Sequence, residues 1–257
     1  SLEGKEAEPS AMDEARMWRR ALWALLGASV LVRITYLIVY ASEMPLYRAP
    51  LVDAKIYADW ARAIAAGDYW GHGEGVFYRA PLYPYGLAAI RLLAGDFMPS
   101  AAILQAAAGI GVLALAAGFA HRIAGAKAAF WAAALLALYG PLVAAESKLL
   151  ATVPGLFLHL LALWVTLSHV DHPRPFRGAL AGGVFGLAIL IRPQWLALAA
   201  VVPFLFGLPV GRAWLRRWLW FALGIALVLG PVALRNRLVG GDWVLISSNG
   251  GMTFYQG

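Results

Sequence analysis

Long runs of apolar residues alternate with short polar connections along most of the chain. A helix needs about 20 consecutive apolar residues to cross the hydrocarbon layer of a bilayer, and runs close to that length recur from residue 18 onward. The pattern predicts membrane-spanning helices at 18–41, 98–120, 128–145, 149–168, 178–191, 194–211 and 218–234. We therefore expect an all-α integral membrane protein with about seven transmembrane helices.

The stretch 82–95 is apolar but too short for a full span, and it contains Arg91. We interpret it as a helix that lies in, or dips into, the membrane interface. If it does not cross, more Arg and Lys residues lie on the side of the N-terminus than on the other side, as the positive-inside rule requires. This topology gives a polar N-terminal segment of 1–17 and a transmembrane domain of 18–257 with an outer loop of 42–97.

Composition supports a membrane protein and removes several function classes. Hydrophobic residues make up 61% of the 257-residue chain and charged residues only 14%, against about 25% in soluble domains. The net charge of +7 is explained by cations that flank the spans and contact membrane lipids. No basic groove with interleaved aromatic residues is evident, so nucleic acid is not an expected partner. The absence of cysteine excludes disulfides and thiolate chemistry.

The outer loop contains an amphipathic segment that begins at Asp53. Ile56, Trp60 and Ile64 recur at helical spacing, and charged residues occupy the opposite face, a pattern suited to a helix lying flat on the membrane. Asp53 has two interpretations, and the sequence leaves both open. Its carboxylate can cap the helix, or it can serve as a general base at the membrane surface.

Further polar residues lie in the connections on the same side. Glu146 and Lys148 share a tight turn, where they form either a surface ion pair or a second acid and cation facing the same cavity as Asp53. Arg192-Pro193 interrupts two short apolar runs, an arrangement typical either of a snorkelling arginine or of a polar site in a membrane protein. Arg235 follows the last span.

Two other features are less informative. His72 and Glu74 lie in the glycine-rich stretch GDYWGHGEG, where a solvated loop is a better interpretation than a metal site. Arg33 lies within the first span and must face protein or water, because a charge in hydrocarbon is costly. Its spacing identifies no partner.

The outer features place two acids and several cations at about one depth. A guanidinium at that depth is suited to bind the phosphate of a lipid whose tail stays in the bilayer. A carboxylate beside it can accept a proton from an attacking hydroxyl. The acids are Asp53 and Glu146, and the cations are Arg79, Lys148, Arg192 and Arg235.

Four motifs together resemble a known family. They are an aspartate that opens an amphipathic outer-loop helix, FYRAPLYPYGLA, ESKLL after a span, and a glycine-rich span that ends in LIRPQ. This combination resembles the GT-C glycosyltransferases, and within them the branch of protein O-mannosyltransferases and aminoarabinose transferases. The resemblance implies a GT-C-like fold and an inverting transfer of a sugar from a polyprenyl-phosphate carrier to an acceptor hydroxyl.

The resemblance also implies roles for individual residues. Asp53 matches the catalytic acid of the outer loop, and Glu146 matches the second acidic position. Arg79 matches the region of the carrier phosphate, to which Lys148, Arg192 and Arg235 are also assigned, with or without a divalent cation. The residues expected to line the substrate site are Tyr57, Tyr78 and Tyr83.

Members of that family usually continue with further spans, so we expect this chain to be C-terminally incomplete or to act with an additional membrane subunit. We expect it in the cell (inner) membrane, with a cytoplasmic N-terminus and the active site on the periplasmic or extracellular face. Two alternatives stay open. The chain is either a non-catalytic subunit that scaffolds a larger complex, or a lipid or solute transporter, although spans rich in Ala, Leu and Val offer little polar lining for transport.

Overall fold

The computed structural model describes residues 11–71, 75–95, 97–202, 204 and 211–249. Within these residues the regular structure is entirely helical, which confirms the expected all-α class. The helices are α1 (Ala11–Glu43), α2 (Pro45–Arg48), α3 (Asp53–Ala65), α4 (Leu82–Ala94), α5 (Phe97–Ala137), α6 (Gly140–Glu146), α7 (Thr152–Asp171), α8 (Pro175–Ile191), α9 (Trp195–Val201) and α10 (Arg212–Gly240).

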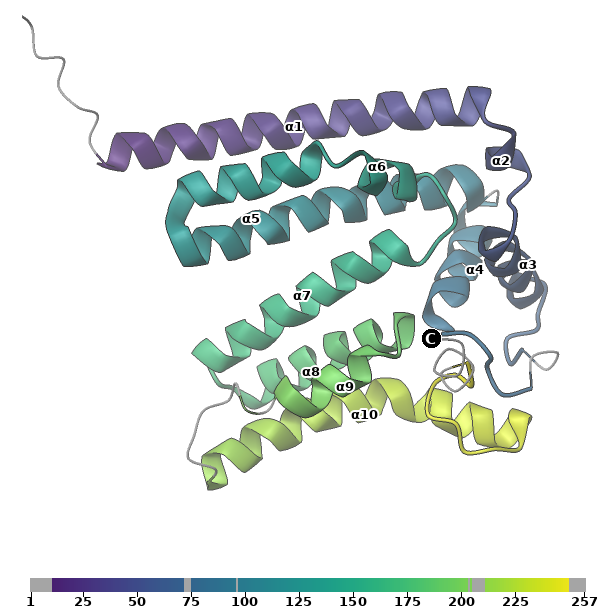
Figure 1. Ribbon diagram of the computed structural model, residues 1–257. Coiled ribbons are helices and arrows are strands. Elements are labelled where there is room, and N and C mark those ends of the chain that lie inside the picture. Colours follow the sequence, from purple (N-terminus) through teal and green to yellow (C-terminus); the bar gives the residue numbers. More distant parts are fainter. Residues whose placement is uncertain (1–10, 72–74, 96, 203, 205–210, 250–257) are drawn as a thin grey trace, which may run out of the picture.

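Helix α5 contains two of the predicted spans, because the chain reverses direction inside it (Figure 1). The backbone leaves helical geometry at Ala124 and at Gly125, whose φ of 79° is one that glycine adopts without the steric cost of a side chain. The arm before the kink corresponds to the predicted span 98–120. The arm after it, continued by α6, corresponds to 128–145.

The apolar helices confirm a multi-pass membrane protein. Four helical segments of the described residues are long and apolar enough to cross a bilayer, and two apolar helices are shorter. The long segments are Met12–Glu43, Met98–Ala137, Thr152–Asp171 and Arg212–Gly240, and the shorter ones are Leu82–Ala94 and Pro175–Ile191. Helix α9 covers the first part of the predicted span 194–211, most of whose remainder lies outside the described residues.

The long helices lie roughly side by side, and α2, α3 and α4 gather at one end of them (Figure 1). We call this the loop end. The opposite end carries the start of α1, the start of α10 and the kink of α5, and we call it the kink end. Helices α8 and α10 approach closely because Gly182 has no side chain, and a Cβ at this position would overlap the backbone of Phe221. Small residues are typical of membrane helix interfaces.

A buried ion pair joins α1 to the end of α6. The Arg33 guanidinium donates to Glu146 Oε1 from Nε at 3.1 Å and from Nη2 at 2.9 Å, and the two residues are 2% and 1% exposed. Arg33 also donates to the carbonyl of Ser29. The pair occupies the space beside Gly109 of α5, where a Cβ would overlap the carboxylate. The partner of Arg33, which its spacing did not identify, is therefore Glu146.

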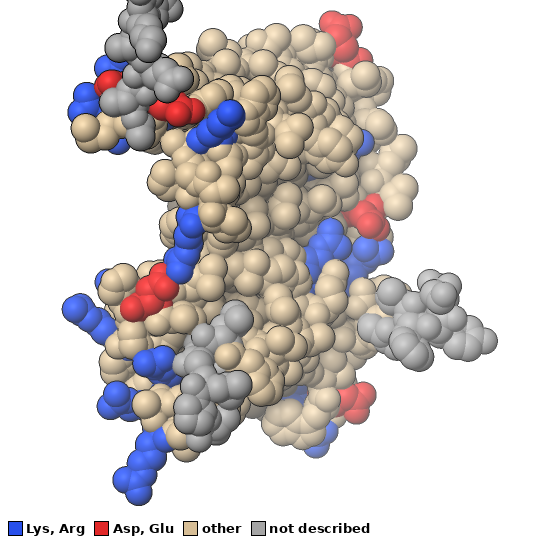
Figure 2. Space-filling model, turned by 60° about the vertical axis from the view of Figure 1, so that its left-hand side comes forward, with Lys and Arg blue, Asp and Glu red and all other residues tan. Residues whose placement is uncertain are grey.

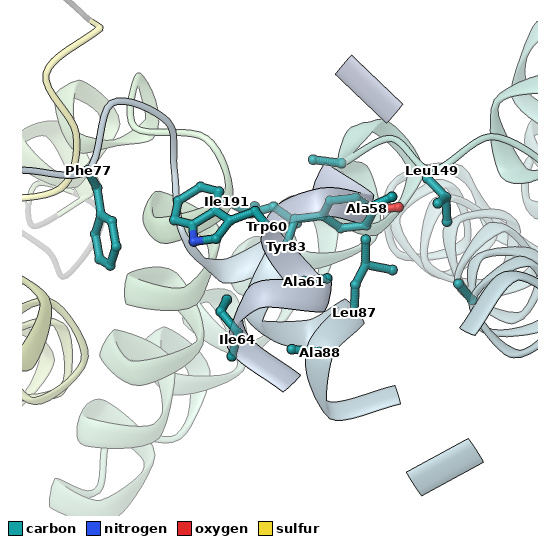
Figure 3. Close-up of a cluster of buried hydrophobic side chains, with 12 residues drawn as sticks. Ala58, Trp60, Ala61, Ile64, Phe77, Tyr83, Leu87, Ala88, Leu149 and Ile191 are labelled. Atoms are coloured by element: carbon teal, nitrogen blue, oxygen red, sulfur yellow. The ribbon is translucent and has the colours of Figure 1, made fainter. Parts of the chain in front are cut away.

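Helix α3 packs on protein rather than presenting its whole apolar face to the membrane. Trp60 and Ile64 are buried in a cluster with Leu87 and Ala88 of α4 (Figure 3). Helix α4 therefore supplies part of the apolar surface that covers α3, and the position of α3 flat on the membrane stays a prediction. The other face of α3 carries Asp59, which accepts hydrogen bonds from its neighbours at 2.5 and 2.6 Å. The bond from Lys55 is the main reason that the pKa of Asp59 is lowered.

The Arg33–Glu146 pair gives a first testable prediction. In a Glu146→Gln variant the Arg33 guanidinium stays buried without a charged partner, and such broken pairs cost about 3–5 kcal/mol. We therefore expect a clear loss of stability, measured by thermal or denaturant unfolding of the purified protein in detergent.

Two variants serve as controls. Asp59→Asn removes two exposed ion pairs, with Lys55 and Arg62, and should change stability by about 1 kcal/mol. Arg33→Met/Glu146→Met removes both charges together and should recover most of the loss, since an apolar replacement of a buried pair is often neutral. A Glu146→Gln protein as stable as Asp59→Asn would contradict the role of the pair.

Candidate active site

A cavity of about 320 Å³ lies at the loop end, between the segment that leads into α3 and the turn after α6. We call it the Asp53 cavity. Its lining includes one acid and one cation that the sequence had singled out, Asp53 and Lys148. The other lining residues that matter here are Tyr40, Val52, Met98 and Ser147. The structure therefore brings residues 95 positions apart in the chain to one hollow.

Asp53 is the first residue of α3, and Val52 occupies the N-cap position. Asp53 is therefore not the N-cap residue that one interpretation of the sequence made it. Val52 has a φ of 50°, which is unusual for a β-branched residue and costs about 1–3 kcal/mol. Strain of this kind is often found at functional sites, and here it immediately precedes the carboxylate.

Arg79 is the ion-pair partner of Asp53. Its Nη1 lies 3.0 Å from Asp53 Oδ1, and the two side chains are 27% and 47% exposed. The guanidinium also lies 6.0 Å from the ring centre of Tyr57. Both charged groups are therefore held in place but remain open to solvent and to an incoming ligand.

A chain of contacts connects Tyr57 to the turn that carries Lys148. Tyr57 packs edge-on against Tyr83, with ring centres 5.1 Å apart. The Tyr83 hydroxyl donates to Gln105 Oε1 at 3.0 Å. Gln105 Nε2 donates at 2.9 Å to the carbonyls of Glu146 and of Lys148. Two of the three expected substrate-lining tyrosines thus belong to one network, whereas the third, Tyr78, is exposed beside Arg79 in the chain.

Glu146 does not line the Asp53 cavity. Its carboxylate faces Arg33 in the interior, so it does not form the surface ion pair that was one of its two interpretations. The residues that follow it, Ser147 and Lys148, do line the cavity. Glu146 thus holds in place the turn that presents Lys148, and its direct part in chemistry stays a prediction.

Arg192 lies at the loop end, beside the start of α7. Helix α8 ends at Ile191, and Arg192 is extended, as expected for a residue before proline. Its Nη2 lies 3.5 Å from Thr152 Oγ1, and its side chain passes over Gly155. The structure places it next to the short segment that connects Lys148 to α7.

Arg235 is buried, and backbone carbonyls surround its guanidinium. It donates to Trp70 O at 2.7 Å, to Gly71 O at 2.5 Å and to Gly75 O. The guanidinium lies 3.8 Å from the ring centre of Phe77, and the residue is only 5% exposed. It ties the loop before Arg79 to α10, and its contact with a carrier phosphate stays a prediction.

Asn236 continues this clip. Its Oδ1 accepts from the backbone N–H of Phe77 at 3.2 Å, and its Nδ2 donates to the carbonyls of Val244 and Ile246. Neither Asn236 nor Gln105 was among the residues predicted from the sequence. Gln105 left a signal, because an amide alone in an apolar run needs a partner. Asn236 lies in the polar sequence RNR and left none.

A metal site finds no support in the part of the chain that the structure describes. No group of three or more His, Cys, Asp or Glu side chains is arranged there to hold an ion. Glu74 and His72, for which a metal role was weighed, lie outside the described residues.

Comparison with protein families finds one match. The family described as dolichyl-phosphate-mannose-protein mannosyltransferase matches residues 78–234, more than half of the chain. The chain belongs to this family. Comparisons with curated proteins and with solved structures gave no match.

Membership in the mannosyltransferase family supports glycosyl transfer at a membrane, in agreement with the resemblance on which the sequence analysis relied. The matched segment contains Arg79, Tyr83, Gln105 and Lys148 and starts directly after Phe77. Asp53 precedes it. Asp53 contacts the matched segment through its ion pair with Arg79, the second residue of that segment.

The clip around Arg235 gives a second prediction. In an Arg235→Lys variant, one ammonium group replaces the planar guanidinium and cannot donate to the carbonyls of Trp70, Gly71 and Gly75 at the same time. We expect a loss of about 2 kcal/mol and faster cleavage of the loop near Tyr69 and Trp70 in limited proteolysis with chymotrypsin. Arg237→Lys, at an exposed position on the same turn of α10, is the matched control. Equal cleavage of both variants would contradict the clip.

Proposed function

We propose that the protein transfers a sugar from a polyprenyl-phosphate carrier to an acceptor hydroxyl at the Asp53 cavity, with inversion at the anomeric carbon. One observation carries the proposal: the half-exposed Asp53 carboxylate lines a cavity that Lys148 also lines, and it is paired with the Arg79 guanidinium beside it. A carboxylate can take the acceptor's proton, and two cations can hold a phosphate.

The Asp53–Arg79 pair suits an exchange of partners. Without a donor, each charge is balanced by the other, at 3.0 Å. A phosphate group that reaches Arg79 competes with Asp53 for the guanidinium, because a charge-assisted hydrogen bond to phosphate is at least as strong as one to a carboxylate. Donor binding then releases the Asp53 carboxylate for its role as base, so the base is freed only when the sugar is present.

The carrier's tail has a place beside the cavity. An apolar groove of about 400 Å³ lies among α4, α5, α7 and α8, and it includes Tyr83 and Gln105 in its lining. These are the same residues that connect Tyr57 to the Lys148 turn. A polyprenyl chain in this groove would bring its phosphate toward Arg79 while the tail stays at the depth of the apolar helices.

The transfer requires one bond to form and one to break. The acceptor oxygen attacks the anomeric carbon, and its proton passes to the Asp53 carboxylate. The bond between the anomeric carbon and the phosphate oxygen breaks, and the carrier phosphate leaves with both bonding electrons. Arg79 and Lys148 offset the charge that develops on it, and we assign Arg192, which lies 3.5 Å from Thr152 after the Lys148 turn, to the same phosphate. A divalent cation would act on the same phosphate.

The charge distribution supports an orientation. Of the Arg and Lys residues that the structure describes, ten lie at the kink end and nine at the loop end, with Arg33 between them. The positive-inside rule then places the kink end in the cytoplasm and the Asp53 cavity on the outer face of the cell (inner) membrane. The arrangement of Asp53, Arg79 and Lys148 gives no comparable support to a scaffold subunit or to a transporter. An additional membrane subunit is compatible with the proposal.

Asp53→Asn tests the base. We expect the turnover rate to fall about 10²- to 10⁴-fold, because the amide cannot accept the proton, whereas donor binding is kept or strengthened as Arg79 loses its competitor. The measurements are transfer of label from a polyprenyl-phosphate sugar, with mannose tried first, and equilibrium binding of the same donor. Asp59→Asn, six residues along the same helix, is the matched control. Turnover of Asp53→Asn at the control's rate would exclude Asp53 from this role.

Arg79→Gln tests the phosphate ligand. Losing a charged hydrogen bond of about 1.5–3 kcal/mol should weaken donor binding about 10- to 100-fold, with the acceptor's apparent affinity nearly unchanged. Arg62→Gln, on the exposed face of α3, is the control. An Arg79→Gln protein that binds donor like the control would separate Arg79 from the carrier.

A further inference from the structure

A second, larger cavity lies at the kink end, far along the bundle from Asp53. Its volume is about 690 Å³, and it is bounded by the start of α1 and by both arms of α5. We call it the kink-end cavity. Space exists there because the α5 side is built from small residues, namely Ala114, Ala117, Gly118, Ala126 and Ala129. A volume of this size is typical of a ligand site.

The cavity is apolar along most of its length and cationic at one end. On α1 it is lined by Arg16 and Arg19, followed by Leu22, Trp23 and Leu26. With a rise of about 1.5 Å per residue, Arg16 and Leu26 are about 15 Å apart along the helix axis. On α5 the order is the same, with His121 near the cationic end and Ala114 near the apolar end.

The charges at the cationic end are available to a ligand. Arg16 and Arg19 are exposed, and no Asp or Glu is among the described residues that line the cavity. The neighbouring Glu14 accepts a hydrogen bond from Trp18 Nε1 at 3.1 Å. In Figure 2, where the kink end is turned forward, Lys and Arg side chains project along the left-hand edge, with a smaller number of Asp and Glu side chains among them.

The apolar end is open to the surroundings of the bundle. Trp23 is 69% exposed, although it also lines the cavity. In a multi-pass membrane protein, an apolar surface at this position on α1 contacts lipid. An occupant can therefore enter sideways from the bilayer, with its chain along the helix axis and its head at the arginines.

We propose that the kink-end cavity binds one anionic glycerophospholipid. Its acyl chain fills the space over the small residues of α5, and its phosphate lies between Arg16 and Arg19. An anionic headgroup matches two cations with no acid in the lining, and a membrane lipid matches an apolar slot that runs parallel to spanning helices. This site is separate from sugar transfer, and its test does not depend on the proposed function.

The test compares two lipids with identical acyl chains, phosphatidylglycerol and phosphatidylcholine, on the purified full chain. Native mass spectrometry measures the lipid retained per protein, and a titration followed by thermal shift gives the affinity. We expect tighter binding of phosphatidylglycerol. In Arg16→Gln/Arg19→Gln that advantage should shrink about fivefold for each arginine removed.

Two further variants make the result specific. Arg212→Gln/Arg216→Gln removes the same charge from exposed positions at the same end, on α10, and should keep the preference. Ala114→Phe keeps both arginines but fills the slot from an exposed position, and it should lower the retention of phosphatidylglycerol. The proposal is overturned if wild type holds both lipids equally, if the α10 variant loses as much preference as the α1 variant, or if Ala114→Phe retains lipid like wild type.

Discussion

A fully buried guanidinium and carboxylate, Arg33 and Glu146, set the position of the wall that carries Lys148. In an apolar interior neither charge is tolerable alone, so each determines where the other must lie. Lys148 comes two residues after Glu146, and Tyr40 comes two helical turns after Arg33. Both Lys148 and Tyr40 line the Asp53 cavity. One ion pair therefore fixes two sides of the Asp53 cavity. The pair has space to form because Gly109 has no side chain.

The position of Arg79, the partner of Asp53, depends on the end of α10. Arg235 and Asn236 bind the backbone at Trp70, Gly71, Gly75 and Phe77, and Asn236 also binds the carbonyl of Ile246. The backbone N–H groups of Ser248 and Asn249 also donate to the carbonyls of Phe77 and Tyr78. Arg79 follows directly and is succeeded by Pro81 at the start of α4. Arg79 thus lies between two segments that are held in place, the backbone at Phe77 and Tyr78 and the start of α4. This restricts the positions that its guanidinium can occupy.

Much of the fold could be predicted because its cause is local. The length of an apolar run determines whether a helix can span a bilayer, and periodicity revealed α3 with its start at Asp53. The reversal of α5 occurs at Gly125, between runs already predicted as separate spans. The sequence showed that the apolar face of α3 must be covered, but it did not show that α4 covers part of it.

The site was predicted in part. Topology sufficed to bring Asp53, Arg79 and Lys148 to one end, because successive spans alternate direction. It could not pair Arg33 with Glu146, which are 113 residues apart. Nor could it show that Arg235 faces carbonyls, since a backbone acceptor has no signature in residue identity. Partners of this kind follow only from the packing of complete helices.

Burial and hydrogen bonding together separate the charged residues of the loop end into two kinds. Arg33, Glu146 and Arg235 are almost fully buried and are engaged by groups of the protein itself. A charge in that condition stabilises the fold, because moving it to a ligand would leave its present partner unpaired and desolvated.

Asp53, Arg79 and Lys148 are partly or largely exposed at or beside the Asp53 cavity. Exchanging their partners costs little, since water or an incoming phosphate can replace a surface ion pair. The chemistry is therefore expected among the second kind, and the first kind maintains its geometry.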